Sequence, residues 1–235
     1  MSLIIQSILG CADISWDGEV GKHRSQYNTD THAVFKNVSS LIRCIIDCQI
    51  ELGDSISIHS ALLLERSLGS KAWDDSPLQM KQIEGIGTVS VRKLVNAGIR
   101  CMDDLEASEP HRIEALIGRN PPFGLKVLEK VGQFPNLRVS LHVQPASVCE
   151  VATFSDCSLI AQARKAADGV MVQIKADIGF INEKLPQRFR NRPVYVCFLA
   201  ELSNGRKIHF ARIRYATGQM MRNADADFLP PVHRN

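Results

Sequence analysis

The sequence lacks the motifs by which most enzymes are recognised. It contains no G-x-x-x-x-G-K-[ST] loop for a nucleotide phosphate, no acidic tetrad for magnesium and no G-x-S-x-G elbow. Its seven histidines fall singly, with no carboxylate or nucleophile at a recognisable spacing. We therefore predict no catalytic residue and no cofactor in this chain.

Cysteine pairs and long apolar runs are also missing. The seven cysteines are scattered without a C-x-x-C pair, which indicates reduced thiols and predicts no metal site. The N-terminal residues lack the basic region of a secretion signal, and no apolar run approaches the roughly 20 residues of a membrane span. We therefore expect no membrane partner.

Charge is present but unevenly distributed. The net charge of +3 is too small to indicate a nucleic-acid partner by itself. Residues 1–78 carry 6 basic and 10 acidic side chains, residues 79–136 carry 8 and 7, and residues 137–235 carry 14 and 8. The C-terminal third is therefore the basic part of the chain.

Residues 82–99 are the most informative stretch, because Gly85 and Gly87 flank Ile86 there. Apolar residues then follow at the spacing of a helix face, and Gly98 is placed to end that helix. This pattern predicts a helix-hairpin-helix turn, whose second helix can receive a phosphate oxygen at its free N–H groups. The predicted nucleic-acid contacts here are Gly85, Gly87, Thr88, Ser90, Arg92 and Lys93. The same turn also packs two short helices together, and the residues alone favour neither use.

Residues 13–30 are predicted to form a polar loop. The long helix predicted after them, over residues 31–52, carries a second candidate surface. Its broad apolar side is expected to be buried and consists of Val34, Val38, Leu41, Ile42, Ile45, Ile46 and Ile50. Its other side carries small, amide and cationic groups at steps of three and four, which we call the polar stripe: Ala33, Lys36, Asn37, Ser40, Arg43 and Cys44. The predicted strand contacts are Lys36, Asn37, Ser40 and Arg43. A solvated helix surface is the alternative interpretation.

From residue 137 the apolar period changes to two. Strands are predicted over residues 137–144, 170–178, 194–202 and 207–215, with a hairpin turn at Asn204-Gly205. This number of short strands favours an immunoglobulin-like sandwich. A loop between two of them gathers Lys184, Arg188, Arg190 and Arg192, which can bind phosphates or acidic protein surfaces, or serve solubility alone.

The sequence therefore predicts an α+β, multi-domain fold in three parts. A helical bundle occupies residues 1–78, a helix-hairpin-helix domain residues 79–135, and an immunoglobulin-like (fibronectin-type) β-sandwich residues 136–235. In the second part, Asp103 or Asp104 is expected to cap a short helix, and Ser108 the helix after it.

This order of parts resembles the Sec63 (Sec-sixty-three) unit that ends each motor cassette of Ski-two-like superfamily 2 helicases. Four segments carry the resemblance: residues 3–9, residues 73–78, residues 82–87 with residues 93–99, and residues 120–124 with Phe134-Pro135. The last of these, Asn-Pro-Pro-Phe-Gly with Phe-Pro, is similar to the meiotic ATP-dependent DNA helicases of the Mer-three (HFM-one) type.

The resemblance implies a role in a larger protein. The helix over residues 31–52 would be the family's ratchet helix, which touches single-stranded nucleic acid. The archaeal relatives carry an arginine and a tryptophan where this chain has Ala33 and Ser40, so Lys36 and Arg43 become the stronger candidates for contact. The chain would be the non-catalytic accessory region of an ATP-dependent 3′–5′ DNA helicase, with ATP and magnesium held by motor domains outside it.

The implied setting is meiotic recombination, with crossover formation, in the nucleus. The expected partners are single-stranded DNA, the motor domains of the same protein and, through the sandwich, a MutL-like mismatch-repair heterodimer. We assign Arg188, Arg190 and Arg192 to that docking, without a motif to support it. The alternative is a protein-interaction scaffold in a spliceosomal-type RNA helicase, with a purely structural hairpin.

Overall fold

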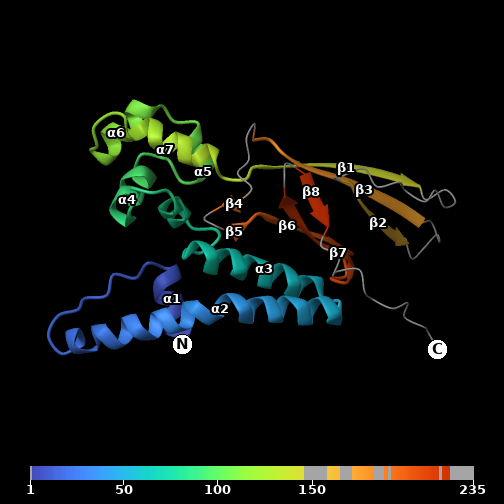
Figure 1. Cartoon of the computed structure of the whole chain (residues 1–235), viewed down its shortest axis with the longest axis horizontal. Helices are drawn as coiled ribbons and strands as arrows, with labels where there is room; N and C mark the ends of the chain where they lie inside the picture. The colour runs from blue at the N-terminus through green and yellow to red at the C-terminus, as the bar shows by residue number, and fades with distance from the viewer. Residues whose placement is uncertain are drawn as a thin grey trace. The chain divides into compact units, whose positions relative to one another are not determined.

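The computed structural model describes residues 2–145, 158–164, 171–182, 188–189, 192–216 and 219–222. The chain forms two compact units (Figure 1). The first comprises Met1–Leu52 and Ile56–Gly132, and the second comprises Gly53–Ser55 and Gln133–Asn235. Helices make up the first unit and antiparallel strands the second, as the α+β prediction requires. None of the described helices is both long enough and apolar enough to cross a membrane.

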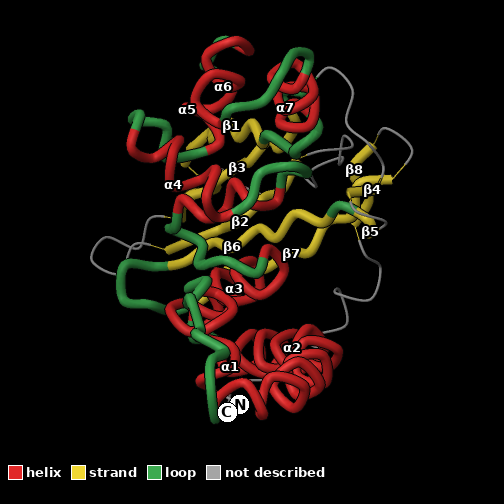
Figure 2. The backbone as a smooth tube through the Cα atoms, turned by 90° about the vertical axis from the view of Figure 1, so that its left-hand side faces the viewer, coloured by secondary structure: helices red, strands yellow, loops and turns green. Residues whose placement is uncertain are grey.

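The N-terminal part of the first unit is built from three helices and a short 3-10 turn. They are α1 (Ser2–Leu9), η1 (Val20–His23), α2 (Arg24–Leu52) and α3 (Ser55–Ser70). α2 and α3 lie side by side in both views, and α1 packs on α2 (Figures 1 and 2). Their core is mainly apolar, with Leu9, Ile46 and Ile58 completely buried, and α3 also carries the buried Ser55 and Ser67.

α2 begins at Arg24, seven residues before the start predicted from the apolar pattern. Its first two turns carry almost no apolar side chain, so the helical period could not be seen there. Side-chain bonds one turn apart support them instead, with Gln26 Nε2 donating to Asp30 Oδ1 at 2.7 Å and Thr29 Oγ1 donating to Ser25 O at 3.1 Å. The expectation of a polar loop over residues 13–30 is therefore wrong from residue 20 onward.

The expected apolar side of α2 is only partly buried. Ile42 and Ile46 lie in the core, but Leu41 is 61% exposed and Ile45 is 48% exposed. Together these four residues span more than one face of the helix, and a single neighbouring helix in the bundle covers only one face. The prediction that the whole apolar side faces the bundle core is thus wrong.

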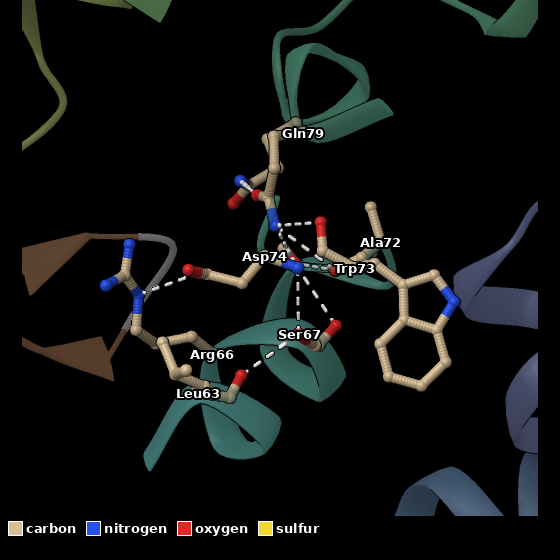
Figure 3. Close-up of polar contacts among 9 residues, drawn as sticks. Leu63, Arg66, Ser67, Ala72, Trp73, Asp74 and Gln79 are labelled. Carbon is tan, nitrogen blue, oxygen red and sulfur yellow. Dashed lines mark hydrogen bonds and ion pairs between the residues drawn. The ribbon is translucent and has the colours of Figure 1, made fainter. Parts of the chain in front are cut away.

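A network of hydrogen bonds fixes the chain where α3 ends (Figure 3). Ser67 Oγ accepts from the N–H of Asp74 at 3.0 Å, and Gln79 Nε2 donates to the carbonyls of Ala72 and Trp73 at 3.1 and 3.0 Å. The indole of Trp73 points away from these groups and is 38% exposed. This network holds the segment that connects α3 to the next helices in one conformation.

The remaining helices of the first unit are short and closely packed. They are η2 (Pro77–Gln82), α4 (Thr88–Asn96), α5 (Met102–Glu106), α6 (Pro110–Ile117) and α7 (Phe123–Gly132). Ile83, Leu94, Leu105 and Ile113 are fully buried between them. Gly124 is required at the start of α7, because a Cβ there would lie 2.1 Å from the carbonyl oxygen of Pro110.

The described residues of the second unit form two three-stranded antiparallel sheets and a two-stranded one. The first sheet has the order β1-β3-β2, from β1 (Leu137–Pro145), β2 (Ser158–Arg164) and β3 (Met171–Phe180). The second has the order β6-β7-β8, from β6 (Tyr195–Glu201), β7 (Lys207–Ala216) and β8 (Gln219–Arg222). The short pair is β4 (Arg188–Phe189) with β5 (Arg192–Pro193).

The two larger sheets share one apolar core. Ala176 and Ile178 from β3 pack with Val196 from β6 and with Ala211 and Ile213 from β7. The predicted Asn204-Gly205 turn joins β6 to β7, with Gly205 at a φ of +79°. The prediction of strands followed by a tight hairpin is therefore confirmed for this pair.

Candidate nucleic-acid interface

The glycine turn of the sequence lies directly before α4, and its first glycine serves packing. Gly85 has a φ of +88°, which a residue with a side chain rarely adopts, and a Cβ there would lie 3.0 Å from Cε2 of Phe123. The Phe123 ring thus lies close against the turn. Because the Asn-Pro-Pro-Phe-Gly segment supplies that ring, two of the segments that carry the family resemblance meet here.

The second glycine serves the N-terminus of α4. Gly87 is the N-cap of the helix, with an extended backbone, and offers no side chain to bond the first N–H groups. The first bond of the helix runs from Val91 N–H to Gly87 O at 3.0 Å. Within the residues that the structure describes, the N–H groups of Gly87, Thr88, Val89 and Ser90 have no protein acceptor. We call these four groups the α4 amides.

These amides form an electropositive site. Gly87 is exposed, and Val89 is 66% exposed although its side chain is apolar. The helix dipole adds partial positive charge at the same end. An anion with several acceptor oxygens, such as a phosphate diester, therefore has both unused donors and a favourable field at this point.

The two cations predicted beside the turn are already engaged within the protein. Arg92 Nη2 lies 2.6 Å from Asp13 Oδ2, and this hydrogen bond raises the pKa of the Arg92 guanidinium. Lys93 Nζ donates to the carbonyl oxygen of Ile117 at 3.0 Å, at the C-terminal end of α6. Both side chains are exposed, but their first role in the fold is to join α4 to the N-terminal loop and to α6.

The polar stripe of α2 is on the surface, as its residue types suggest. Lys36, Asn37, Ser40 and Arg43 are all exposed. The amide of Asn37 donates to Ala33 O at 3.0 Å, and Arg43 Nε lies 3.2 Å from Glu65 Oε1 on α3. For the ammonium group of Lys36, the described part of the chain offers no partner. Unlike Arg43, Lys36 is thus a cation of the polar stripe that can bind an anion without first breaking an ion pair.

The arginines predicted for partner docking lie in different structural settings. Arg188 belongs to β4 and Arg192 to β5, so they stand on the backbone of a short antiparallel pair instead of a loop. Arg188 is paired with Pro193, and Arg192 with Phe189. Arg190 lies outside the described residues.

Sequence reasoning missed the residues on the first turns of α2. Arg24, Tyr27 and Asn28 fell within the segment expected to be a loop, yet they line a pocket together with Thr88 of α4. No apolar period marks these turns in the sequence, because the contact of Tyr27 with Trp16, whose ring centroids lie 5.1 Å apart, helps to hold them.

Comparison with known proteins places this arrangement in a family context. Residues 2–222 match the family model described as the Sec63 Brl domain. The "ATP-dependent DNA helicase homolog MER3" of Arabidopsis thaliana is 34% identical over 118 residues, which cover 50% of this chain and 10% of that protein.

Two further relatives carry the same kind of name. The "ATP-dependent DNA helicase MER3" of Saccharomyces cerevisiae is 28% identical over 149 residues, covering 63% of this chain and 12% of the relative. The "Probable ATP-dependent DNA helicase HFM1" of Homo sapiens is 25% identical over 142 residues, covering 60% of this chain and 9% of the relative. The chain thus spans about a tenth of the length of the relatives that it matches.

Proposed function

The chain belongs to the Sec63 Brl domain family, and from this premise we propose that it is a non-catalytic accessory region of an ATP-dependent DNA helicase that guides single-stranded DNA. The observation that carries the proposal is the set of four α4 amides, which lie at an exposed helix N-terminus without a protein acceptor in the described structure. Phosphate is the anion that such a site accepts on a nucleic acid.

The proposed path uses two surfaces with different chemistry. The α4 amides bind backbone phosphate, while Lys36 on the polar stripe attracts the strand electrostatically. Neither surface offers groups arranged to read base edges, so the contact is independent of sequence. We propose α2 as the ratchet-type helix of a bundle over residues 1–78, and residues 79–135 as the helix-hairpin-helix domain.

The wider role follows from the family premise and the names of the relatives. We propose that the parent protein is a 3′–5′ helicase of meiotic recombination and crossover formation, that it works in the nucleus, and that its motor domains bind ATP and magnesium. The second unit is proposed as an immunoglobulin-like sandwich, since its two larger sheets share a core. It would dock partner proteins, a MutL-like heterodimer being the proposed example.

The central part of the proposal is tested by binding of the 235-residue chain to a labelled single strand. Fluorescence anisotropy at a series of salt concentrations should give an affinity whose logarithm falls with the logarithm of salt, by about 0.7 for each phosphate neutralised. Replacing Lys36, Arg43, Arg92 and Lys93 together by glutamine should reduce that slope. If affinity and slope both stay unchanged, these side chains do not guide a strand.

A second candidate function is favoured by one observation. Arg92 and Lys93 are both engaged within the protein, as they would be if the hairpin were structural and the chain a protein-interaction scaffold of an RNA helicase. Under that function the chain would bind neither single-stranded DNA nor RNA above the level of its quadruple variant. Equal binding of both would instead favour a guiding role that does not distinguish them.

A further inference from the structure

A pocket of about 420 Å³ lies in the first unit, where six segments of the chain converge. They are α1, the loop after it, the first turns of α2, Lys71 directly after α3, the end of η2 and the first residue of α4. Its volume lies in the range of small-ligand sites. The lining residues that matter for its chemistry are Trp16, Arg24, Tyr27, Lys71, Lys81 and Thr88.

One wall of this pocket is aromatic and held in place. Tyr27 Oη lies 2.7 Å from Ser7 Oγ, which also donates to Ile4 O at 2.8 Å, so α1 fixes the phenol. The ring of Trp16 is tilted by 56° against that of Tyr27. Gly21 lets the chain pass close to Trp16, because a Cβ at Gly21 would lie 2.7 Å from the Trp16 carbonyl oxygen. Two rings held in this way offer a stacking surface at little cost in conformational entropy.

Other lining residues of the pocket are cationic. Lys81 Nζ donates to Cys11 Sγ at 2.7 Å, and Lys71 Nζ lies 5.6 Å from the centroid of the Phe35 ring. Across the described ranges, no carboxylate comes within ion-pair distance of Arg24, Lys71 or Lys81. Asp13, the acidic residue of the lining, is neutralised by Arg92. The pocket therefore has an excess of positive charge.

Thr88 connects the pocket to the α4 amides. Its N–H is one of the four groups without a protein acceptor, and the residue itself lines the pocket. A phosphate bound at the amides therefore has two aromatic rings and three further cations within the same cavity. A phosphate bonded to a planar aromatic ring system matches that combination, and nucleotides are such molecules.

We propose that this pocket receives one nucleotide, with its base against Tyr27 and Trp16 and its phosphate toward Lys71, Lys81 and the amide of Thr88. The proposal rests on the proposed function, since it supplies a base-stacking site to the same strand-binding surface. Stacking on a ring is possible for every base, so the pocket adds affinity without sequence preference.

The experiment uses the intrinsic fluorescence of Trp16. The chain has two tryptophans, so Trp73→Phe leaves Trp16 as the sole tryptophan, and Trp73 is not one of the residues that line the pocket. Three ligands are titrated: a ten-residue oligothymidylate, the same backbone with abasic sites, and free thymidine monophosphate. Inorganic phosphate serves as the anion control. We expect the oligothymidylate to change the Trp16 emission and the abasic strand to leave it near its free value.

The variants of Tyr27 give the second readout. Tyr27→Leu should weaken oligothymidylate binding by about tenfold, the lower part of the range for losing one stacked base. Tyr27→Phe keeps the ring while removing the bond to Ser7, and should retain the affinity of the parent chain. Tyr195→Leu replaces an exposed tyrosine of the second unit and is the matched control.

The outcomes separate the pocket from the proposed function. A Trp16 response to the oligothymidylate alone supports a strand nucleotide as the occupant, and an equal response to thymidine monophosphate supports a free nucleotide. Equal binding of the abasic strand, with no Trp16 response to any ligand, overturns the pocket but leaves strand guiding intact. Absence of strand binding and of any Trp16 response overturns both.

Discussion

The N-termini of α7 and α4 lie in the same cluster of short helices, but they differ in whether the protein supplies an acceptor for their first N–H groups. At α7 the buried side chain of Glu114, 7% exposed, accepts the N–H of Gly124 at 2.8 Å. At α4 the cap is a glycine, and the described structure shows no acceptor for the first N–H groups. The fold thus supplies a carboxylate to one helix and leaves the other available to an anion from outside.

α5 repeats the pattern of α7 at the surface. Asp104 Oδ2 accepts from the N–H groups of Arg100 and Cys101, and Cys101 Sγ accepts from the N–H of Asp104. A reciprocal bond of this type is a capping box. α4 lacks such a box, since its N-cap is a glycine without a side chain.

The largest effect on stability is expected from adding a side chain at the start of α7. Gly124→Ala puts a methyl group against the Pro110 carbonyl, a backbone atom that cannot move aside, and should lower the free energy of unfolding by about 3 kcal/mol or more. Urea denaturation followed by circular dichroism measures the change. Gly132→Ala, at the other end of α7 with open space around it, is the matched control and should be neutral or slightly stabilising. Equal stability of the two variants would contradict the packing described.

A smaller loss is expected when the internal anion of α7 is removed. Glu114→Ala leaves the buried Gly124 N–H without its acceptor and should cost about 2 kcal/mol of unfolding free energy. Glu114→Gln keeps an oxygen at the same place and should cost less. If the alanine and glutamine variants unfold at the same urea concentration, the carboxylate is not what satisfies this helix.

The open N-terminus of α4 can be tested by giving it an internal anion. Val89→Glu places a carboxylate beside the α4 amides at an exposed position, where it should raise stability by about 0.3–1 kcal/mol through the helix dipole. The same charge repels phosphate, so binding of a single strand should fall about tenfold, or about 1.4 kcal/mol. Val89→Gln, which has the same shape without the charge, is the control. Unchanged strand binding alongside higher stability would show that no strand reaches these amides.

Substitutions in the polar stripe of α2 should have smaller effects on strand binding. Lys36→Gln removes a cation that has no partner in the described structure, and should reduce the salt dependence of strand binding by about 0.7 in logarithmic slope. Arg43→Gln should change it less, because Glu65 already neutralises this guanidinium. A larger effect from Arg43 than from Lys36 would reverse the assignment.

The smallest predicted effect concerns the capping box of α5. The N–H of Arg100, followed by the Cys101 side chain, lowers the pKa of Asp104 below its ordinary value. The resulting stabilisation is present above the unfolded-state pKa of about 3.9 and is lost as the pH falls through the lower folded-state value. Asp104→Asn should therefore lower the melting temperature at neutral pH, with the difference fading in acid. A difference that is constant from pH 7 to pH 2.5 would contradict this.

Sequence patterns predicted the elements with strong periodicity and missed those held by polar contacts. The match over residues 2–222 confirms the family resemblance, and the turn at Gly85–Gly87 correctly marked the start of α4 at Thr88. The first turns of α2 were missed because hydrogen bonds one turn apart and the Trp16–Tyr27 contact stabilise them, and neither leaves an apolar period.

Local caps were also harder to predict than apolar faces. Asp103 or Asp104 was the expected cap of α5, whereas the cap is Cys101 with Asp104 three residues later. Ser108 was the expected cap of α6, but the N-cap is Glu109, and Ser108 Oγ donates to Asp104 O at 2.7 Å. The engagement of Arg92 with Asp13 joins residues 79 positions apart, and no local pattern indicates such a pair.

The most direct test compares the backbone of the hairpin with its cations. Proline at the first helical position keeps a helix intact, so Thr88→Pro removes one of the α4 amides, while Thr88→Ala keeps it. Both are measured by single-strand anisotropy against the double variant Arg92→Gln with Lys93→Gln. We predict that Thr88→Pro weakens binding severalfold, while Thr88→Ala and the double variant stay near the parent affinity. Loss of binding in the double variant, with Thr88→Pro unaffected, would contradict the account.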